Sequence, residues 1–326
     1  MSVRKTHATA GLIVAALSAT PVVASEDAAS WLRQLGEAPR RLSYDGVFVH
    51  MTGTSLDALR VVHKVNGGTV RERIYALNGA PREVIRDAER VWCYMPEKGL
   101  GVHEYRQSND AGFPRSFETI PPELGRHYEL RLGREDRIAD RRARQLLITP
   151  RDEFRYGHEL WADAASGLLL KSAILDSNDA PLEQYVFTHI VIGGNVDEKE
   201  LTAATPKQAL SWKAMEQPPP AADEKTELRW HVRNPPAGFL MSTALRRVSQ
   251  ADSGFIVHLV YSDGLAAVSV FVERGSADDR GFMPGTHRMG AMHAFGIVVD
   301  GHRVTVIGEV PARTVEMIGH SVSRKP

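Results

Sequence analysis

The sequence predicts a mainly β protein of the α+β class, built as two domains. We expect an N-terminal open, curved antiparallel sheet or half barrel, and a smaller C-terminal antiparallel sheet with one packed helix. Short runs rich in Val, Ile, Leu and aromatic residues recur with Asn, Asp, Gly or Pro between them, as such sheets require. The hydrophobic pattern lapses between Ala203 and Glu227, and 326 residues suffice for about two domains.

The first 24 residues have the composition of a secretory signal. Basic Arg4 and Lys5 precede an apolar stretch, residues 8–19, that is too short to span a bilayer, and small residues follow up to Ala24. We expect cleavage after Ala24 and export across a membrane; an uncleaved anchor, interrupted by Pro21, is the alternative. Without the signal, 38 basic and 40 acidic residues remain, and this near-neutral charge points to no nucleic-acid partner.

The N-terminal domain is expected to cover residues 25–204 and to open with a short amphipathic helix, Ala28–Leu35. After Pro39 the apolar period changes from three or four to two, which indicates strands. The predicted strands are Tyr44–Met51, Leu59–Val65, Val70–Leu77, Glu83–Arg86, Arg90–Met95, Gly101–Tyr105, Tyr128–Leu132, Ala143–Thr149, Tyr156–Ala162, Leu168–Leu175 and Gln184–Ile192. Unless a helix fills it, the apolar concavity of such a sheet can hold an acyl chain or an extended peptide.

A stiff connector, residues 205–227, is expected to separate the domains, because prolines and polar residues gather at Pro218–Asp223. The second domain then covers residues 228–322 and includes the segment Phe239–Leu245. Two strand-forming runs, Phe255–Tyr261 and Ala266–Glu273, flank turn residues and predict a hairpin.

A further strand and a helix complete the predicted C-terminal domain. The strand is Val304–Val310, and Pro311 stands where a helix can begin. Val315, Ile318 and Val322 follow at helical spacing. We therefore expect one helix to pack on this small sheet.

The chain offers no catalytic constellation, so we expect neither an enzyme nor a cofactor. Ser262 and Asp263 lie in a predicted turn outside any G-x-S-x-G motif, where a serine usually bonds its own backbone. A zinc site from His287, His293 and His302 is conceivable, but no spacing favours it over structural histidines. An exported hydrolase is the weakest of the alternatives.

Two sets of residues are candidates for binding a lipid. One set alternates within the predicted strands and could line the cavity, although ordinary core is the commoner role: Trp92, Tyr94, Met95, Trp161 and Leu169. The other comprises Arg141 and Arg142 in the arginine-rich segment 131–144, since guanidinium groups bind phosphates and carboxylates. Acidic residues alternate with these arginines and favour a mixed-charge, solvated surface.

Several motifs resemble the MucB/RseB family of periplasmic regulators of sigma-E. They are YDGVFVH and RERIYALNGAPREVIRD in the N-terminal half, and YSDGLAAVSVFVE, MGAMHAFG and VDGHRVTVIGEVP in the C-terminal domain. The resemblance covers nearly the whole mature chain. It implies an N-terminal domain similar to lipoprotein carriers, with a hydrophobic cavity, and a partner-binding C-terminal domain.

The resemblance also implies a function. The protein would bind the periplasmic segment of a membrane anti-sigma factor (RseA/MucA-like), shield it from the site-one protease and release it when lipid or lipopolysaccharide binds. Exposure and motif position suggest these partner contacts: Phe239, Tyr261, Ser262, Asp263, Gly264 and Leu265. The connector is the expected hinge, and a homodimer is left open. The main alternative is a periplasmic lipid or lipoprotein carrier, which would need only the N-terminal domain.

Overall fold

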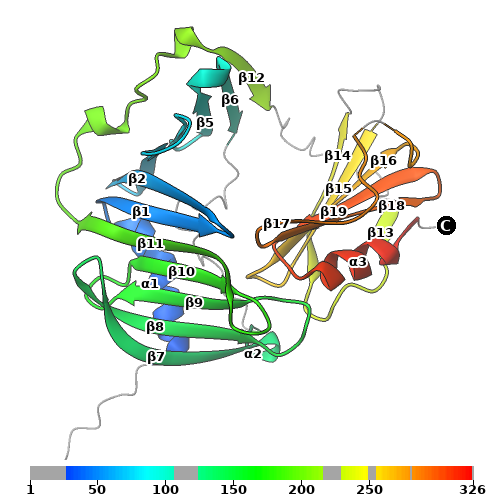
Figure 1. The fold of residues 1–326 in the computed structure, drawn as a ribbon, viewed down its shortest axis with the longest axis horizontal. Coiled ribbons are helices and arrows are strands. Elements are labelled where there is room, and N and C mark those ends of the chain that lie inside the picture. Colours follow the sequence, from blue (N-terminus) through cyan, green and yellow to red (C-terminus); the bar gives the residue numbers. More distant parts are fainter. Residues whose placement is uncertain (1–26, 106–123, 216–228, 249–254, 280, 325–326) are drawn as a thin grey trace, which may run out of the picture.

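The computed structural model describes residues 27–105, 124–215, 229–248, 255–279 and 281–324. In this part of the chain two sheets lie side by side, with α1 crossing one face of the larger sheet and α3 packed on the smaller one (Figure 1). The predicted signal, residues 1–24, lies outside the described residues. The same is true of Pro218–Asp223 in the expected connector.

The N-terminal domain is built on one twelve-stranded, open sheet. Its strands run in the order β12-β6-β5-β4-β3-β2-β1-β11-β10-β9-β8-β7. Their bounds are β1 Tyr44–Thr52, β2 Ser55–Asn66, β3 Thr69–Ala76, β4 Glu83–Arg86, β5 Arg90–Met95, β6 Leu100–Tyr105, β7 Tyr128–Ile138, β8 Arg141–Pro150, β9 Gly157–Asp163, β10 Leu169–Leu175, β11 Pro181–Ile192 and β12 Ser211–Met215. The eleven strands predicted for this domain are therefore confirmed.

Helix α1, Ala28–Arg41, covers the inner face of this sheet, the face that bears Leu160 and Leu169. Trp31, Leu32 and Leu35 of the helix pack on that face. The helix continues beyond Leu35, its predicted end. Its last turn includes Pro39, whose carbonyl oxygen lies 2.7 Å from the Nε2 of buried His63. Tertiary contact therefore extends the helix through a proline that by itself favours an earlier end.

The C-terminal domain is a six-stranded antiparallel sheet with one helix on it. The strand order is β14-β15-β16-β19-β18-β17, with bounds β14 Leu240–Val248, β15 Phe255–Ser262, β16 Ala267–Arg274, β17 Gly285–Met289, β18 Met292–Val299 and β19 His302–Gly308. Helix α3, Ala312–Ser321, buries Val315 and Ile318 against the sheet, as predicted. Strands β13, Trp230–Val232, and β20, Val322–Arg324, pair separately beside it.

Some short elements were not predicted from the sequence. These are β12, β13, β17, β18, β20, the one-turn helix α2, Leu124–His127, and the 3-10 turns Pro96–Lys98, Glu198–Leu201 and Lys207–Ala209. The expectation that residues 205–227 form only a connector is wrong in its first part, because Ser211–Met215 joins the first sheet as β12. This strand runs parallel to β6, and its Trp212 ring lies over Gly101.

Candidate functional site

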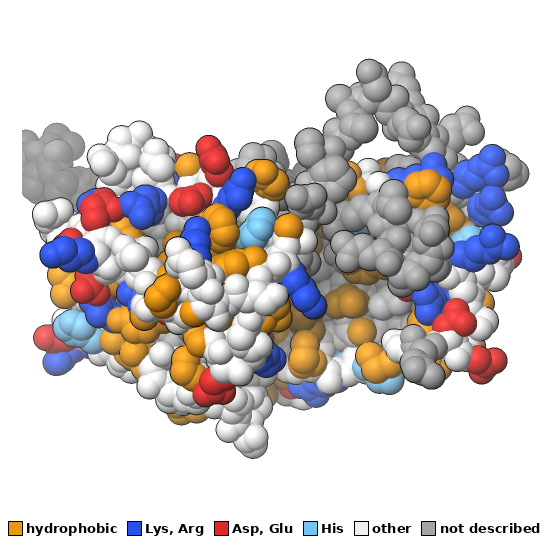
Figure 2. All heavy atoms as spheres, turned by 90° about the horizontal axis from the view of Figure 1, so that it is seen from above, with side chains coloured by type: hydrophobic (Ala, Val, Ile, Leu, Met, Phe, Trp, Pro, Cys, Tyr) orange, Lys and Arg blue, Asp and Glu red, His pale blue; other side chains and the backbone are white. Residues whose placement is uncertain are grey.

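An apolar cavity of about 640 Å³ lies between the inner face of the N-terminal sheet and the C-terminal sheet. Strands β9 and β10 contribute Leu160 and Leu169 to its wall. The C-terminal domain contributes Leu265, Phe271 and Ile307. Seen from above, apolar side chains are visible in the recess between the two halves of the molecule (Figure 2). A pocket of this size, apolar with few polar groups, is typical of a ligand or peptide site.

A buried polar cluster, here called the latch, joins the two domains beside this cavity. It consists of Tyr128 and Arg155 from the N-terminal domain and Asp263 from the turn between β15 and β16. The Asp263 Oδ2 accepts hydrogen bonds from the Tyr128 hydroxyl at 2.9 Å and from the Arg155 Nε at 2.7 Å. The Arg155 and Asp263 side chains are both 0% exposed. Each charge of this buried pair needs the other, because a buried charge without its counterion is strongly destabilising. The pair therefore holds the two domains together.

The turn sequence explains why Asp263 can form the latch. Its Oδ1 accepts hydrogen bonds from the backbone N–H groups of Leu265 and Ala266, which fixes the side chain and leaves Oδ2 for the other domain. Gly264 has a φ of 97°, a conformation that L side chains rarely adopt. Burial, followed by the neighbouring Asp263 carboxylate, raises the pKa of Tyr128 well above its ordinary value. The Tyr128 phenol therefore remains a hydrogen-bond donor at neutral pH.

Further contacts cross the domain boundary near the latch. The Thr314 Oγ1 of α3 donates to the Phe154 carbonyl oxygen at 2.7 Å. An ion pair joins Arg313 to Glu153. Leu265 belongs to the same buried cluster as Leu160 and α1. The two domains thus share packed apolar contacts as well as polar ones.

Comparisons with known proteins agree with this architecture. Residues 27–205 match the MucB/RseB N-terminal domain, and residues 224–323 match the MucB/RseB C-terminal domain. The chain belongs to the MucB/RseB family. Members of this family are regulatory proteins, not enzymes.

Individual members of the MucB/RseB family are similar over nearly their full length. The sigma factor AlgU regulatory protein MucB of Pseudomonas aeruginosa is 34% identical over 320 residues, 95% of each chain. The sigma-E factor regulatory protein RseB of Salmonella typhimurium is 27% identical over 309 residues, 92% of each chain. The crystal structure of MucB in complex with MucA(peri) superposes with a TM-score of 0.70 at 31% identity, covering 92% of this chain and 100% of that one.

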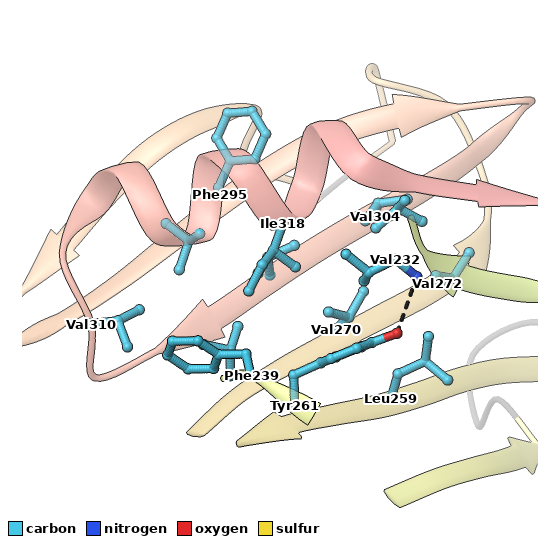
Figure 3. Close-up of a cluster of buried hydrophobic side chains, with 14 of the residues drawn as sticks. Val232, Phe239, Leu259, Tyr261, Val270, Val272, Phe295, Val304, Val310 and Ile318 are labelled. Carbon is cyan, nitrogen blue, oxygen red and sulfur yellow. Dashed lines mark hydrogen bonds between the residues drawn. The ribbon is translucent and has the colours of Figure 1, made fainter. Parts of the chain in front are cut away.

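This MucB/RseB family member buries most of the residues expected to contact a partner. Phe239, Tyr261, Asp263 and Leu265 are at most 9% exposed, so their expected exposure is wrong. The rings of Phe239 and Tyr261 point into the core beneath α3 (Figure 3), where the Tyr261 hydroxyl accepts from the Val232 N–H. Asp263 and Leu265 lie at the domain interface. Among these residues of the turn, Gly264 is exposed.

The Ser262 side chain belongs to the turn itself, as expected. Its Oγ donates to the Ala266 carbonyl oxygen at 2.8 Å and accepts from the Gly264 N–H. These bonds close the turn. The sequence interpretation of Ser262 as a turn residue is confirmed.

The aromatic residues considered for lipid binding lie in different places. Leu169 lines the inter-domain cavity. Trp161 is buried outside it, with its Nε1 donating to Glu159 and its ring beside Arg134. Successive side chains of a strand point to opposite faces, and its neighbour Leu160 faces the cavity, so Trp161 faces away. The expectation that Trp161 lines the cavity is therefore wrong.

The remaining three aromatic and apolar candidates lie on β5, away from the cavity. Trp92 and Tyr94 pack edge-on against Trp212 of β12, with ring centroids 5.4 and 5.1 Å apart. Met95 borders a smaller, separate pocket beside Arg82. These residues do not line the inter-domain cavity, because they are several strands distant from it in the sheet.

The arginines of the segment 131–144 are ion-paired. Arg141 makes a two-pronged contact with buried Asp163, at 2.7 and 3.1 Å. Arg142 lies 3.0 Å from Glu135. Arg134, Arg137 and Arg144 are paired in the same way with Asp136, Asp140 and Glu135. This arrangement matches the mixed-charge surface weighed above, and lipid binding at Arg141 and Arg142 stays a prediction.

The three histidines considered for zinc are each engaged separately. The His287 ring lies 3.1 Å from the Pro284 carbonyl oxygen, His293 2.8 Å from that of Val310 and His302 2.8 Å from that of Asp300. Within the described ranges, no three His, Cys, Asp or Glu side chains are grouped to hold a metal ion. In the same ranges, no helix combines the length and apolar character needed to cross a membrane.

Sequence reasoning missed two residues that carry the domain interface, Tyr128 and Arg155. Each is a polar residue in a strand or loop. In the sequence it looks like a solvated side chain, because its partner in the other domain lies far away along the chain. The isolated Arg155 in RDEFRYG has acidic neighbours on its N-terminal side, which point to a local ion pair. That local pair exists, with Asp152, but the second carboxylate comes from 108 residues further along the chain.

Proposed function

We propose that this protein is a periplasmic regulator of a sigma-E-type envelope-stress response. It is exported, cleaved after Ala24, and binds the periplasmic segment of a membrane anti-sigma factor. Binding shields that segment from proteolysis and so represses the sigma factor. Lipid or lipopolysaccharide releases the segment.

The observation that carries the proposal is the full-length likeness to MucB in complex with MucA(peri). At 31% identity over 92% of this chain, the similarity extends across both domains and so includes the surfaces between them. The cavity lined by Leu160, Leu169, Leu265 and Phe271 supplies an apolar site of suitable size. We place the partner segment there, in an extended conformation between the two sheets.

Release by lipid requires that the lipid and the segment favour different states of the protein. An acyl chain suits the same apolar walls, so that lipid and segment compete for one site. Competition for this site is sufficient for lipid to lower the affinity for the segment. Separation of the domains at the latch would lower that affinity further. Protection from proteolysis follows while the segment lies between the sheets, because a protease must bind an extended chain that is accessible on both sides.

The direct test is a calorimetric titration of residues 25–326 with the periplasmic segment of the anti-sigma factor from the same organism. We expect saturable one-to-one binding that weakens as lipopolysaccharide is added. A limited digestion of the segment, with and without the protein, measures the shielding. Absence of binding would remove the proposal.

A variant that fills the cavity tests the location of the site. Ser172→Trp places an indole in the cavity wall and should reduce affinity for the segment by about 10-fold or more, because the bulk excludes the ligand. Ser55→Trp adds the same indole at an exposed position of β2 and should bind like the parent protein. Equal affinities for both variants would place the segment elsewhere.

A lipid or lipoprotein carrier is the second candidate, favoured by the apolar character of the same cavity. However, Leu265 and Phe271 of the C-terminal domain form part of the wall, so a carrier using this site would need both domains. Stoichiometric lipid uptake and transfer to an acceptor, without binding of the anti-sigma segment, would favour this second function.

A further inference from the structure

The inter-domain cavity carries negative charge on its apolar wall. Among its described lining residues are two carboxylates, Glu183 and Glu309, and neither lysine nor arginine. The rest of the lining is largely apolar, with Leu160, Leu169 and Ile307 among its members. A ligand in this cavity therefore meets hydrocarbon on most sides and acidic groups at defined points.

Glu183 is held in place and ionised. Its Oε1 accepts hydrogen bonds from the Tyr185 hydroxyl at 2.7 Å and lies 2.8 Å from the His50 Nε2. The His50 and Tyr185 rings stack 4.3 Å apart, which fixes both partners. The hydrogen bond with His50 is the main cause that lowers the pKa of Glu183, against burial, so the carboxylate is charged at neutral pH.

The other oxygen of Glu183 faces the C-terminal domain. A Cβ at Gly290, in the turn between β17 and β18, would lie 3.9 Å from the Glu183 Oε2 and 2.5 Å from Thr52. Both hydrogen bonds described above are made to Oε1. Oε2 thus lies at the domain boundary, where an occupant held between the domains would cover it.

Covering this oxygen has an energetic consequence for the occupant. A purely apolar ligand would strip water from an ionised carboxylate without replacing it, which is costly. A phosphate or carboxylate would place like charge beside Glu183 and would meet neither lysine nor arginine among the described lining residues, which include one histidine, His158. A lysine or arginine side chain fits, since its aliphatic stem packs on apolar walls while its head donates to the carboxylate.

We propose that the cavity recognises a basic side chain of the partner segment through Glu183 and that it excludes anionic lipid headgroups. This inference rests on the proposed function, because it assigns the chemistry of the segment bound at the same site. Glu183 is then the residue that distinguishes the protein partner from the lipid. A lipid can insert an acyl chain between the domains only with its headgroup outside the cavity.

The experiment is a double-mutant cycle measured by calorimetry. Each Lys or Arg of the anti-sigma segment is replaced in turn by Met, which keeps an apolar stem and removes the charge, and each peptide is titrated into the parent protein and into Glu183→Gln. We expect one replacement to weaken binding to the parent by about 10-fold or more. The same replacement should have little further effect in Glu183→Gln.

The control variant is Glu129→Gln, which removes an exposed charge on β7 outside the cavity and should bind every peptide like the parent. Affinity for lipopolysaccharide should be unchanged or higher in Glu183→Gln. The inference is overturned if no peptide replacement weakens binding, or if Glu183→Gln binds lipopolysaccharide less well. It is also overturned if the peptide replacement weakens binding to Glu183→Gln by the same factor as binding to the parent protein. If Glu183→Gln is unfolded, the peptide series on the parent protein still tests whether a basic side chain of the segment is required.

These outcomes separate the two proposals. A native segment that does not bind the parent protein removes both of them. If the segment binds tightly but its affinity is unchanged by replacing its basic residues or Glu183, only the recognition proposed here is wrong. The proposed regulatory function then still stands.

Discussion

At the scale of single residues, Asp263 has two structural roles that depend on its two oxygens. Oδ1 closes its own turn through the Leu265 and Ala266 N–H groups, and Oδ2 binds Tyr128 and Arg155 of the other domain. One carboxylate therefore couples the local conformation of a hairpin to the position of a domain. Arg155 also contacts the C-terminal domain through its guanidinium group, which lies 4.9 Å from the centroid of the Phe239 ring. This cation–π contact reinforces the position of the domain.

Removing the Arg155 charge should destabilise the protein strongly. Arg155→Met leaves the Asp263 carboxylate buried without its cation, and such a loss costs about 3 to 5 kcal/mol in the free energy of unfolding. Urea unfolding followed by tryptophan fluorescence measures it. Arg142→Met is the matched control, because Arg142 is 79% exposed in its pair with Glu135 and should leave the midpoint unchanged. Equal midpoints for the two variants would contradict a buried latch.

Asp163 should contribute stability that acid removes. Burial raises the pKa of this carboxyl, but hydrogen bonds from Arg141 and Ser166 outweigh it and hold the pKa below its ordinary value. A group whose pKa is lower in the folded state stabilises that state above its unfolded pKa, and the contribution fades as pH falls below about 4.

The measurement is the free energy of unfolding of the parent and Asp163→Asn between neutral pH and about pH 3. We expect the parent to be the more stable at neutral pH and the difference to shrink in acid. A difference that stays constant over this range would show that Asp163 does not titrate differently in the two states.

At the scale of elements, β12 shows how a segment after the last predicted strand returns to the sheet. It pairs parallel to β6 at the sheet edge, and the Trp212 ring covers Gly101, packing against Trp92 and Tyr94. A Cβ at Gly101 would lie 2.6 Å from the Trp212 ring. The glycine therefore makes room for the tryptophan that anchors β12.

Gly101→Ala should weaken this edge. The added methyl group forces the Trp212 ring away, at a cost of about 1 to 3 kcal/mol in the free energy of unfolding. In a Trp212→Ala background the same substitution should cost much less, because the clash is gone. Gly125→Ala, with open space around its Cβ, is the control. Additive effects of Gly101→Ala and Trp212→Ala would show that the ring does not lie over the glycine.

At the scale of the whole molecule, contacts at separate points join the described parts of the two domains around the cavity. Leu265 of the second domain packs among Leu160, Leu146 and α1 of the first. The latch lies beside it, and the Gly290 turn contacts Thr52 at a separate point. The cavity between these contacts can therefore change size when they loosen, without unfolding of either sheet.

Leu265→Asp should separate the domains. The substitution places a charge in an apolar cluster of the other domain, and the favourable response is for that interface to open to water. Small-angle X-ray scattering should give a larger radius of gyration, and affinity for the anti-sigma segment should fall. Leu56→Asp introduces the same charge where the side chain is 55% exposed and should change neither quantity. An unchanged radius for Leu265→Asp would count against this interface.

Much of the fold could be predicted from the sequence because its strands are long and regular. Segments such as Arg90–Met95 and Glu83–Arg86 are found with the predicted bounds, since period-two patterns and turn residues act locally. The short strand β12 was missed because its stability comes from β6 and Trp92, more than a hundred residues earlier in the chain. Leu169 is the predicted lipid-binding residue that lies in the inter-domain cavity.

The sequence by itself determined the β-rich class, the strand pattern, the helix after Pro311 and the resemblance to the family, because each depends on local periodicity or on an ordered set of motifs. Only the tertiary structure decided that Asp263 is buried, that Arg155 is its partner, that Trp161 faces away from the cavity and that Glu183 faces into it. These facts depend on which sheet faces meet across the domain boundary. That pairing is set by packing between residues far apart in the chain, which no local pattern records.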